Sequence, residues 1–280
     1  MDAFEQHRPR LWAIAYRMLG SASDAEDIVQ EAYLRARNVP PEQVQSEQAY
    51  LSSIVTRLCL DHWKSARVKR ETYVGPWLPE PVRTEEPVDP ASISLAFLVL
   101  LESLTPTERA VYLLSQVFDY SHEEIARIVG KDEAACRQLL HRARTHVAAQ
   151  RPRFAPSREA HQRLLEGFVD ACMRGDLARL EQLLAADVTA YHDGGGKVHA
   201  AQRPLVGATK IATLYTSLFR KRPADAQVAI EPINGLPAMV VRLAGRVVSV
   251  VEFETDGARI LALRNVANPD KLARLTRDAP

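Results

Sequence analysis

Cysteine is scarce in this sequence, and the three cysteines that occur are far apart. Cys59, Cys136 and Cys172 each lie among apolar residues at helical spacing, without a CxxC pair or a Cys/His cluster. A structural zinc site needs about four clustered ligands, so we expect neither a metal nor another cofactor. Unpaired cysteines are typical of a reducing compartment, and we therefore expect a cytoplasmic protein.

Long apolar runs and an excess of charge of one sign are also missing. The first residues include acids and no continuous apolar stretch, so we expect no signal peptide and no membrane span. The net charge is +1; residues 1–150 carry 17 Lys and Arg against 21 Asp and Glu, and residues 151–280 carry 19 against 14. A surface that binds nucleic acid must therefore be local.

The chain has 280 residues, 46% of them hydrophobic and 25% charged, which is enough for two or three compact domains. Apolar residues recur at helical spacing from Phe4 to Lys69, and Gly20 separates a first helix from a second that Ser21 or Ser23 can cap. In that second helix Asp24, Asp27 and Glu31 share one face. The acidic face is either simply solvated or a surface for a basic partner.

A third helix is predicted from Gln48 to Arg70, and its end is strongly basic. Lys64, Arg67, Lys69 and Arg70 follow His62 and Trp63 with no acid among the four cations. Cations favour a helix C-terminus in any protein, but four together also fit phosphate binding. We favour a surface for nucleic acid.

The next stretch is rich in proline and acid. Five prolines and four acids fall between Glu71 and Ala91, including the string WLPEP at residues 77–81. Proline extends the backbone and the acids keep it solvated, which predicts a semi-rigid linker over residues 73–94 after a first domain of residues 1–72. Trp77 is expected to dock on another surface.

Residues 95–150 carry the signals of a helix-turn-helix. Thr105–Glu108 and Ser121–Glu124 are capping boxes, Gly130 ends a short helix and Asp132 can cap the next. Ala135, Cys136, Leu139 and Leu140 are predicted to face inward. The outward face of the last helix is basic, so it can enter the major groove of DNA, although an ordinary helical hairpin would share these signals.

Together these motifs resemble the extracytoplasmic-function group of bacterial sigma factors. SDAEDIVQEAYLRA is similar to the region-two helix that binds the β′ clamp helices of RNA polymerase, AYLSSIVTRLCLDHWKSARVKRE to the segment that reads the minus-ten element, and SHEEIARIVGKDEAACRQLLHRAR to the region-four reader of the minus-thirty-five element. The resemblance implies core polymerase, including its β flap, and promoter DNA as partners, and a loop at residues 38–46 that captures splayed bases. An anti-sigma partner can be neither inferred nor excluded.

The resemblance assigns three sets of residues. The polymerase-binding set is Asp24, Asp27, Gln30 and Glu31. The minus-ten set is Arg57, Asp61, His62, Lys64, Arg67, Lys69 and Arg70. The minus-thirty-five set is Arg137, Gln138, His141, Arg142 and Arg144. Arg57 stands where many relatives have Asn, and Asp132 with two alanines departs from the usual recognition helix, so the promoter sequence does not carry over.

The remaining residues, 157–280, predict an α+β domain. Helices are expected at 157–172, 176–185 and 208–219, and strands at 227–231, 238–243, 246–254 and 259–266, with turns at Gly245 and Asp256-Gly257. The order resembles the SnoaL-like domains of the NTF2-like superfold, and WLPEP, DGGGK and NPDKL resemble the signatures of sigma factors with such a fused domain. The set implied to act between domains, in cis, is Trp77, Leu78, Pro79, Glu80, Pro81, Asp193, Gly194, Gly195, Gly196, Lys197, Asn268, Pro269, Asp270, Lys271 and Leu272.

Related cone-shaped domains include enzymes, so some residues of this domain are candidates for catalysis. The candidates are Tyr191, His192, Asp193, His199, Tyr215 and Arg264, but no acid–base pair is identifiable from their spacing. We expect Tyr191 and Tyr215 to pack in the core, His192 and Asp193 to begin the glycine loop, and no enzymatic activity. Two functions stay open: a sigma factor regulated in cis, or a DNA-binding regulator with a ligand-binding or catalytic domain.

Overall fold

The computed structural model describes residues 3–37, 46–84, 93–150 and 157–277. Its contacts divide the chain into two compact units. The helical unit comprises Met1–Thr72 and Leu98–Arg151, and the C-terminal unit comprises Tyr73–Phe97 and Pro152–Pro280. The segment that the sequence predicts to be a linker therefore packs for the most part with the C-terminal unit.

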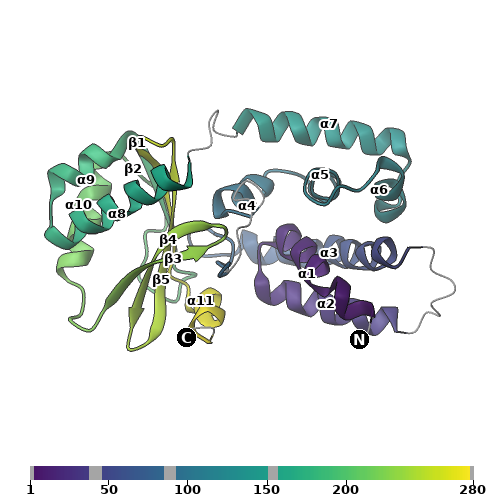
Figure 1. Cartoon of the computed structure of the whole chain (residues 1–280), viewed down its shortest axis with the longest axis horizontal. Helices are drawn as coiled ribbons and strands as arrows, with labels where there is room; N and C mark the ends of the chain where they lie inside the picture. Colours follow the sequence, from purple (N-terminus) through teal and green to yellow (C-terminus); the bar gives the residue numbers. More distant parts are fainter. Residues whose placement is uncertain (1–2, 38–45, 85–92, 151–156, 278–280) are drawn as a thin grey trace. The chain divides into compact units, whose positions relative to one another are not determined.

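The first part of the helical unit is a bundle of α1 (Ala3–Leu19), α2 (Ala22–Ala36) and α3 (Glu47–Glu71), drawn in purple and blue in Figure 1. Gly20, with a φ of 68°, ends α1. The Ser21 hydroxyl then accepts the Asp24 N–H at 3.1 Å and caps α2, as the sequence predicts. The buried face of α2 consists of Ala22, Ala25, Ile28, Val29 and Ala32.

The second part of the unit contains the helix-turn-helix. Its helices are α4 (Leu95–Leu101), which begins in the C-terminal unit, α5 (Pro106–Gln116), α6 (His122–Val129) and α7 (Glu133–Gln150). Both predicted capping boxes form, Gly130 adopts the left-handed conformation that ends α6, and Asp132 accepts the Ala135 N–H at 2.7 Å. These local signals are confirmed, and they orient α7 relative to α6.

The two parts of the helical unit share a core around Arg109 of α5. Its guanidinium is fully buried, donates to the Arg17 carbonyl at 2.9 Å, pairs with Glu102 and lies over the Trp63 ring at 5.6 Å. A buried charge is tolerated only when it is paired in this way. Arg109 therefore ties α5 to the bundle of α1 and α3.

The C-terminal unit is built on one six-stranded sheet. Its strands are β1 (Leu184–Asp193), β2 (Leu205–Val206), β3 (Gln227–Ile233), β4 (Leu236–Leu243), β5 (Arg246–Thr255) and β6 (Ile260–Val266), in the order β2-β1-β6-β5-β4-β3. Only the β1–β6 pair is parallel. The helices are α8 (Arg158–Arg174), α9 (Leu177–Leu183), α10 (Ala208–Arg220) and α11 (Pro269–Arg277).

Helices α8, α9 and α10 lie together on one face of the sheet (Figure 1). The core between them is centred on Phe168 of α8, whose ring meets Tyr215 of α10 at 5.2 Å and Phe253 of β5 at 5.1 Å, both edge to face. Such aromatic pairs add to the stabilisation from buried apolar area. The expectation of two helical modules followed by an α+β domain is thus confirmed.

The sequence-based prediction missed β1 and β2 and placed the start of β1 in a helix. Residues 184–193 are rich in alanine, which favours helices, and their alternation of buried and exposed side chains begins only at Asp187. The prediction that His192 and Asp193 begin the glycine loop was also wrong, because both end β1. The four predicted strands of the meander, by contrast, are all present.

Candidate functional site

The acidic face of α2 presents a mixed surface. Asp27 and Gln30 are exposed, Asp24 and Glu31 are half-buried, and the apolar side chain of Leu34 is 45% exposed beside them. Glu31 pairs with Arg35 at 2.8 Å, one turn along. An exposed leucine next to acids suits a partner that buries an apolar centre within a charged rim. The sequence analysis did not identify Leu34, because a helical pattern does not show whether a single leucine is exposed or buried.

The predicted minus-ten set is only partly described. His62 lies 3.5 Å from Asp24, so one residue from each of two predicted sets comes together on α2 and α3. Asp61 is exposed near the middle of α3. The loop of residues 38–45 lies outside the described residues, as do the side chains of Lys64, Arg67, Lys69 and Arg70.

Arg57 has partners within the helical unit. Its guanidinium donates to the carbonyls of Ile128 at 3.2 Å and Arg127 at 3.1 Å. These carbonyls belong to the last turn of α6, where the helix dipole is negative, so a cation is favoured there. A buried hydrogen bond of 2.6 Å between the hydroxyls of Ser52 and Tyr120 lies along the same junction. The helix predicted to read the minus-ten element thus holds the helix-turn-helix.

The predicted minus-thirty-five set lies along the exposed face of α7. Cys136 and Leu140 are buried beneath it as predicted, whereas Ala135 and Leu139 are half-buried. Arg142 donates to Glu108 at 3.0 Å. Burial opposes ionisation of Glu108, but hydrogen bonds from Thr105 and Arg142 hold the pKa of Glu108 below its ordinary value. The five exposed side chains are Arg137, Gln138, His141, Arg142 and Arg144.

WLPEP lies against the C-terminal unit. Trp77 is half-buried, whereas the residues from Leu78 to Val82 are all buried, and Leu78 is only 2% exposed. Apolar burial of this extent stabilises the segment in place. Within this segment, the Leu78 N–H donates a hydrogen bond to Asp193 at the end of β1.

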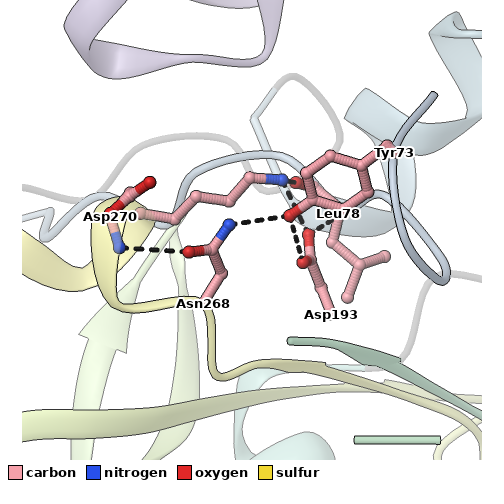
Figure 2. A network of polar contacts seen from close by, with 6 residues as sticks. Tyr73, Leu78, Asp193, Asn268 and Asp270 are labelled. Carbon is pink, nitrogen blue, oxygen red and sulfur yellow. Dashed lines mark hydrogen bonds and ion pairs between the residues drawn. The ribbon is translucent and has the colours of Figure 1, made fainter. Parts of the chain in front are cut away.

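Asp193 is the centre of a polar cluster, called here the Asp193 cluster, which consists of Tyr73, Leu78, Asp193, Asn268 and Lys271. Figure 2 labels the first four of these residues. The fully buried Asp193 carboxylate accepts the Tyr73 hydroxyl at 2.5 Å, the Leu78 N–H at 2.8 Å and the Lys271 ammonium at 2.7 Å. Asn268 donates to the Tyr73 hydroxyl at 2.8 Å. Burial and the Asp193 hydrogen bond raise the pKa of Tyr73, so this hydroxyl stays protonated.

Lys271 connects the cluster with WLPEP. Its ammonium donates to the Leu78 carbonyl and lies over two aromatic rings, Trp77 at 4.3 Å and Tyr73 at 4.8 Å. Cation–π contacts strengthen when the cation is desolvated, as here. Residues from all three strings, WLPEP, DGGGK and NPDKL, therefore meet at one buried carboxylate.

The glycines after Asp193 are required by space as well as by backbone conformation. Gly195, with a φ of 58°, packs so closely that a Cβ there would overlap the Asn268 amide and lie 2.9 Å from the Tyr73 hydroxyl oxygen. At Gly196, with a φ of 71°, a Cβ would lie 3.2 Å from that of Val74. Only glycine combines such a φ with such close approach.

The turn between β3 and β4 forms a second attachment, and the sequence did not reveal it. The buried Asn234 side chain accepts the Val82 N–H at 3.0 Å and donates to the Ile93 carbonyl at 2.9 Å. The Asn234 N–H in turn donates to the Val82 carbonyl at 2.9 Å. Asn234-Gly235 is a strong hairpin signal, but its contact with residues 82 and 93 is a tertiary feature.

Two carboxylates complete the attachment of the linker. Glu231 of β3 pairs with Arg83 at 2.8 Å and with Arg242 of β4, and the hydrogen bonds from Arg242 lower the pKa of Glu231 despite partial burial. Glu252 of β5 is 1% exposed and accepts the N–H groups of Leu95 at 3.1 Å and Ala96 at 3.3 Å. Glu252 thereby caps the beginning of α4.

The candidate catalytic residues do not form an acid–base pair. Asp193 is committed to the linker, and Arg264 pairs with Glu254 at 2.7 Å beneath the half-buried Tyr191 ring. Tyr215 is buried as predicted, beside His192. Across the described ranges no three His, Cys, Asp or Glu side chains gather as metal ligands would. Nor is any helix there both long and apolar enough to cross a membrane.

Comparisons with known proteins agree with these modules. The Sigma-70 region 2 family matches residues 3–68 and the Sigma-70 region 4 family matches residues 94–147. The ECF RNA polymerase sigma factor SigJ of Mycobacterium tuberculosis is 35% identical, over 97% of this chain and 92% of SigJ. The probable ECF RNA polymerase sigma factor SigI of the same species is 31% identical, over 96% of this chain and 93% of SigI.

The likeness extends to three dimensions. The crystal structure of Mycobacterium tuberculosis SigJ superposes with a TM-score of 0.73 at 33% identity, over 96% of this chain and 97% of that one. Both helical modules occur in the sigma-factor order, and the similarity to SigJ continues through the α+β unit. The chain therefore belongs to the extracytoplasmic-function RNA polymerase sigma factors, a family of transcription factors and not of enzymes.

Proposed function

We propose that the C-terminal unit regulates this sigma factor in cis by holding the linker between the two promoter-reading modules. The observation that carries the proposal is the Asp193 carboxylate, which binds Tyr73, Leu78 and Lys271 at once. A buried carboxylate with three donors holds its partners firmly, because removing any donor leaves an unpaired buried group, which destabilises the folded protein.

The linker is held at both of its described ends. Residues 73–84 bind the Asp193 cluster and the β3–β4 turn, and residues 93–97 bind Asn234 and Glu252. Docking fixes the points at which the chain leaves the C-terminal unit on either side, so it removes conformations that a free linker would supply. Promoter engagement needs a particular separation of the two modules, and docking therefore tunes it.

We further propose that different surfaces of the helical unit bind polymerase and DNA. The acidic face of α2 would contact the β′ clamp helices, where charge complementarity sets orientation and association rate. The basic face of α7 would contact the minus-thirty-five element, its module would contact the β flap, and α3 would contact the minus-ten element. For Arg57 this last role requires that its bonds to the α6 carbonyls be released first.

In vitro transcription by the full chain with core polymerase tests the regulatory proposal. Asp193→Asn should change the transcript yield by about twofold or more, in either direction, because it opens the Asp193 cluster. Asp170→Asn is the matched control, since it makes the same change of side chain in the exposed Arg174–Asp170 pair of α8. A truncation before Asn268 should behave like Asp193→Asn. Equal yields from all four proteins would show that the unit does not regulate.

Binding to core polymerase tests the proposed α2 surface. Asp27→Lys with Glu31→Lys should weaken the affinity by about tenfold or more at low salt. Glu166→Lys with Asp170→Lys makes the same change of charge on α8 and should leave the affinity unaltered. An equal loss in both double variants would mean that only net charge matters and that α2 is not the contact.

A further inference from the structure

The C-terminal unit contains a half-open cavity of about 890 Å³ between α10 and the sheet. The strand register builds one wall, because residues paired across a ladder point to the same side. His192, Asn265, Val251 and Met239 are successive partners across β1, β6, β5 and β4, and Ser249, Val241 and Val228 form the next row. A cavity of this size is within the range of small-molecule sites, roughly 300–1,000 Å³.

The side chains around the cavity are chiefly apolar. Leu214, Leu218 and Phe219 of α10 line the cavity, and Leu218 is 48% exposed. Arg222 is the one residue with a permanent charge among the described lining residues, and it already donates to the Phe219 carbonyl at 2.7 Å. The lining thus favours an occupant without a charge.

Two neutral polar groups lie in this apolar lining without hydrogen-bond partners. Both ring nitrogens of His192 and the hydroxyl of Tyr215 are buried and unpaired, and the two rings are 6.3 Å apart. Burial lowers the pKa of His192 and raises the pKa of Tyr215, so both stay uncharged. Buried polar groups are normally satisfied, and each can both donate and accept.

We propose that this cavity binds a neutral, largely apolar small molecule whose hydroxyl or carbonyl oxygen bonds with His192 and Tyr215. Burial of the apolar body against α10 and the sheet supplies the affinity. The oxygen satisfies groups that are otherwise unpaired, which supplies the selectivity.

The linker itself forms part of the cavity wall, which connects the ligand with regulation. Val74 and Gly75 line the cavity next to Gly194 and Gly196 of the glycine loop. A Cβ on Gly75 would lie 3.6 Å from the Gln202 Cα and 3.9 Å from the His192 carbonyl oxygen. A ligand therefore stabilises the docked linker, and docking raises its affinity equally. This coupling rests on the proposed regulation in cis, whereas the binding site does not.

Titration of the full chain with the fluorescent, neutral, apolar probe N-phenyl-1-naphthylamine tests the site. Saturable binding is expected, and Leu214→Trp should weaken it by about tenfold or more because the indole fills the cavity. Thr213→Trp places the same indole on the exposed side of α10 and should bind like the wild type. Absence of saturable binding, or equal binding by both tryptophan variants, would overturn the site.

Displacement of that probe by three ligands with one aromatic body tests the chemical class. The expected order of affinity is 1-naphthol, then naphthalene, then 1-naphthoate. Tyr215→Phe should abolish the advantage of 1-naphthol over naphthalene while the unliganded protein keeps or gains thermal stability, because its hydroxyl has no partner there. Preference for 1-naphthoate that is lost in Arg222→Gln would overturn the neutral class.

Hydrogen exchange separates binding from coupling. Saturating 1-naphthol should slow exchange of the Leu78 amide, and Asp193→Asn should weaken 1-naphthol binding several-fold by undocking the linker. Binding that leaves both measurements unchanged would overturn the coupling and retain the site. Transcription by Asp193→Asn without ligand, measured separately, reports on regulation in cis alone.

Discussion

The carboxylate of Glu252 accepts the backbone N–H of Leu95 at 3.1 Å, so a strand of the C-terminal unit caps the helix that follows the linker. Burial raises the pKa of Glu252 from 4.5 to about 7, although the two N–H donors oppose the change. The folded protein therefore holds the proton more tightly than the unfolded chain does. The contribution of the protonated Glu252 carboxyl to the stability of the fold is therefore complete below pH 4.5 and is lost as the pH rises to about 7.

A comparison with Glu252→Gln isolates this titration. The free energy of unfolding of the wild type should fall relative to that of the variant between pH 4.5 and about 7, by at most about 3 kcal/mol. Urea unfolding at several pH values measures both. A difference between the two proteins that stays constant across this window would contradict the prediction.

Loss of the buried charge at Asp193 should be far more damaging than loss of an exposed one nearby. Asp193→Asn leaves the 12% exposed Lys271 without its ion pair, which should cost about 3 kcal/mol of unfolding free energy. Lys197→Met breaks a pair whose side chains are 50% and 64% exposed, and should cost less than about 1 kcal/mol. Denaturant unfolding compares them, and equal losses would refute the central role of Asp193.

Two glycines with positive φ separate backbone strain from close packing. Gly195→Ala should lower the free energy of unfolding through both backbone strain and steric overlap, because its Cβ would overlap Asn268. Gly245→Ala has open space around its Cβ, so it should lower the free energy of unfolding by only about 1 kcal/mol, through strain alone. Thermal unfolding, with hydrogen exchange at Leu78, measures the difference. Equal destabilisation by the two substitutions would mean that the approach of Gly195 to Asn268 is unimportant.

Salt dependence tests the α7 surface in the complex of the full chain with core polymerase. Arg144→Gln should reduce the slope of log affinity for promoter DNA against log salt by about 1, because one phosphate contact is lost. Arg174→Gln removes an exposed arginine from α8 and should leave the slope unchanged. An unaltered slope in Arg144→Gln would exclude a phosphate contact at that position.

Local signals in the sequence predicted the helical unit well. Capping by Ser21, Thr105 and Ser121 and the left-handed Gly130 each depend on a few adjacent residues, so the pattern alone identifies them. The attachment of the linker depends on distant residues. Glu252 looks like any polar residue on a strand, and Asn234 like any hairpin turn, because their partners are more than 130 positions away in the chain.

The prediction for WLPEP also shows that the sequence does not reveal contacts with residues distant in the chain. The segment has no helix or regular strand, which agrees with its prolines, and Trp77 indicated docking, but the acids suggested solvation. Glu80 is instead only 5% exposed. A short acidic string does not reveal which of its carboxylates a later domain will cover.

Proline also determines how this segment can be released. Pro79 and Pro81 have no N–H, and the neighbouring amides of Leu78 and Val82 are each taken by a side chain, Asp193 and Asn234. A strand within a sheet must unzip a whole ladder before it leaves. This segment is held instead by separate side-chain contacts at Leu78 and Val82, so its release requires that those contacts break but not that a ladder opens.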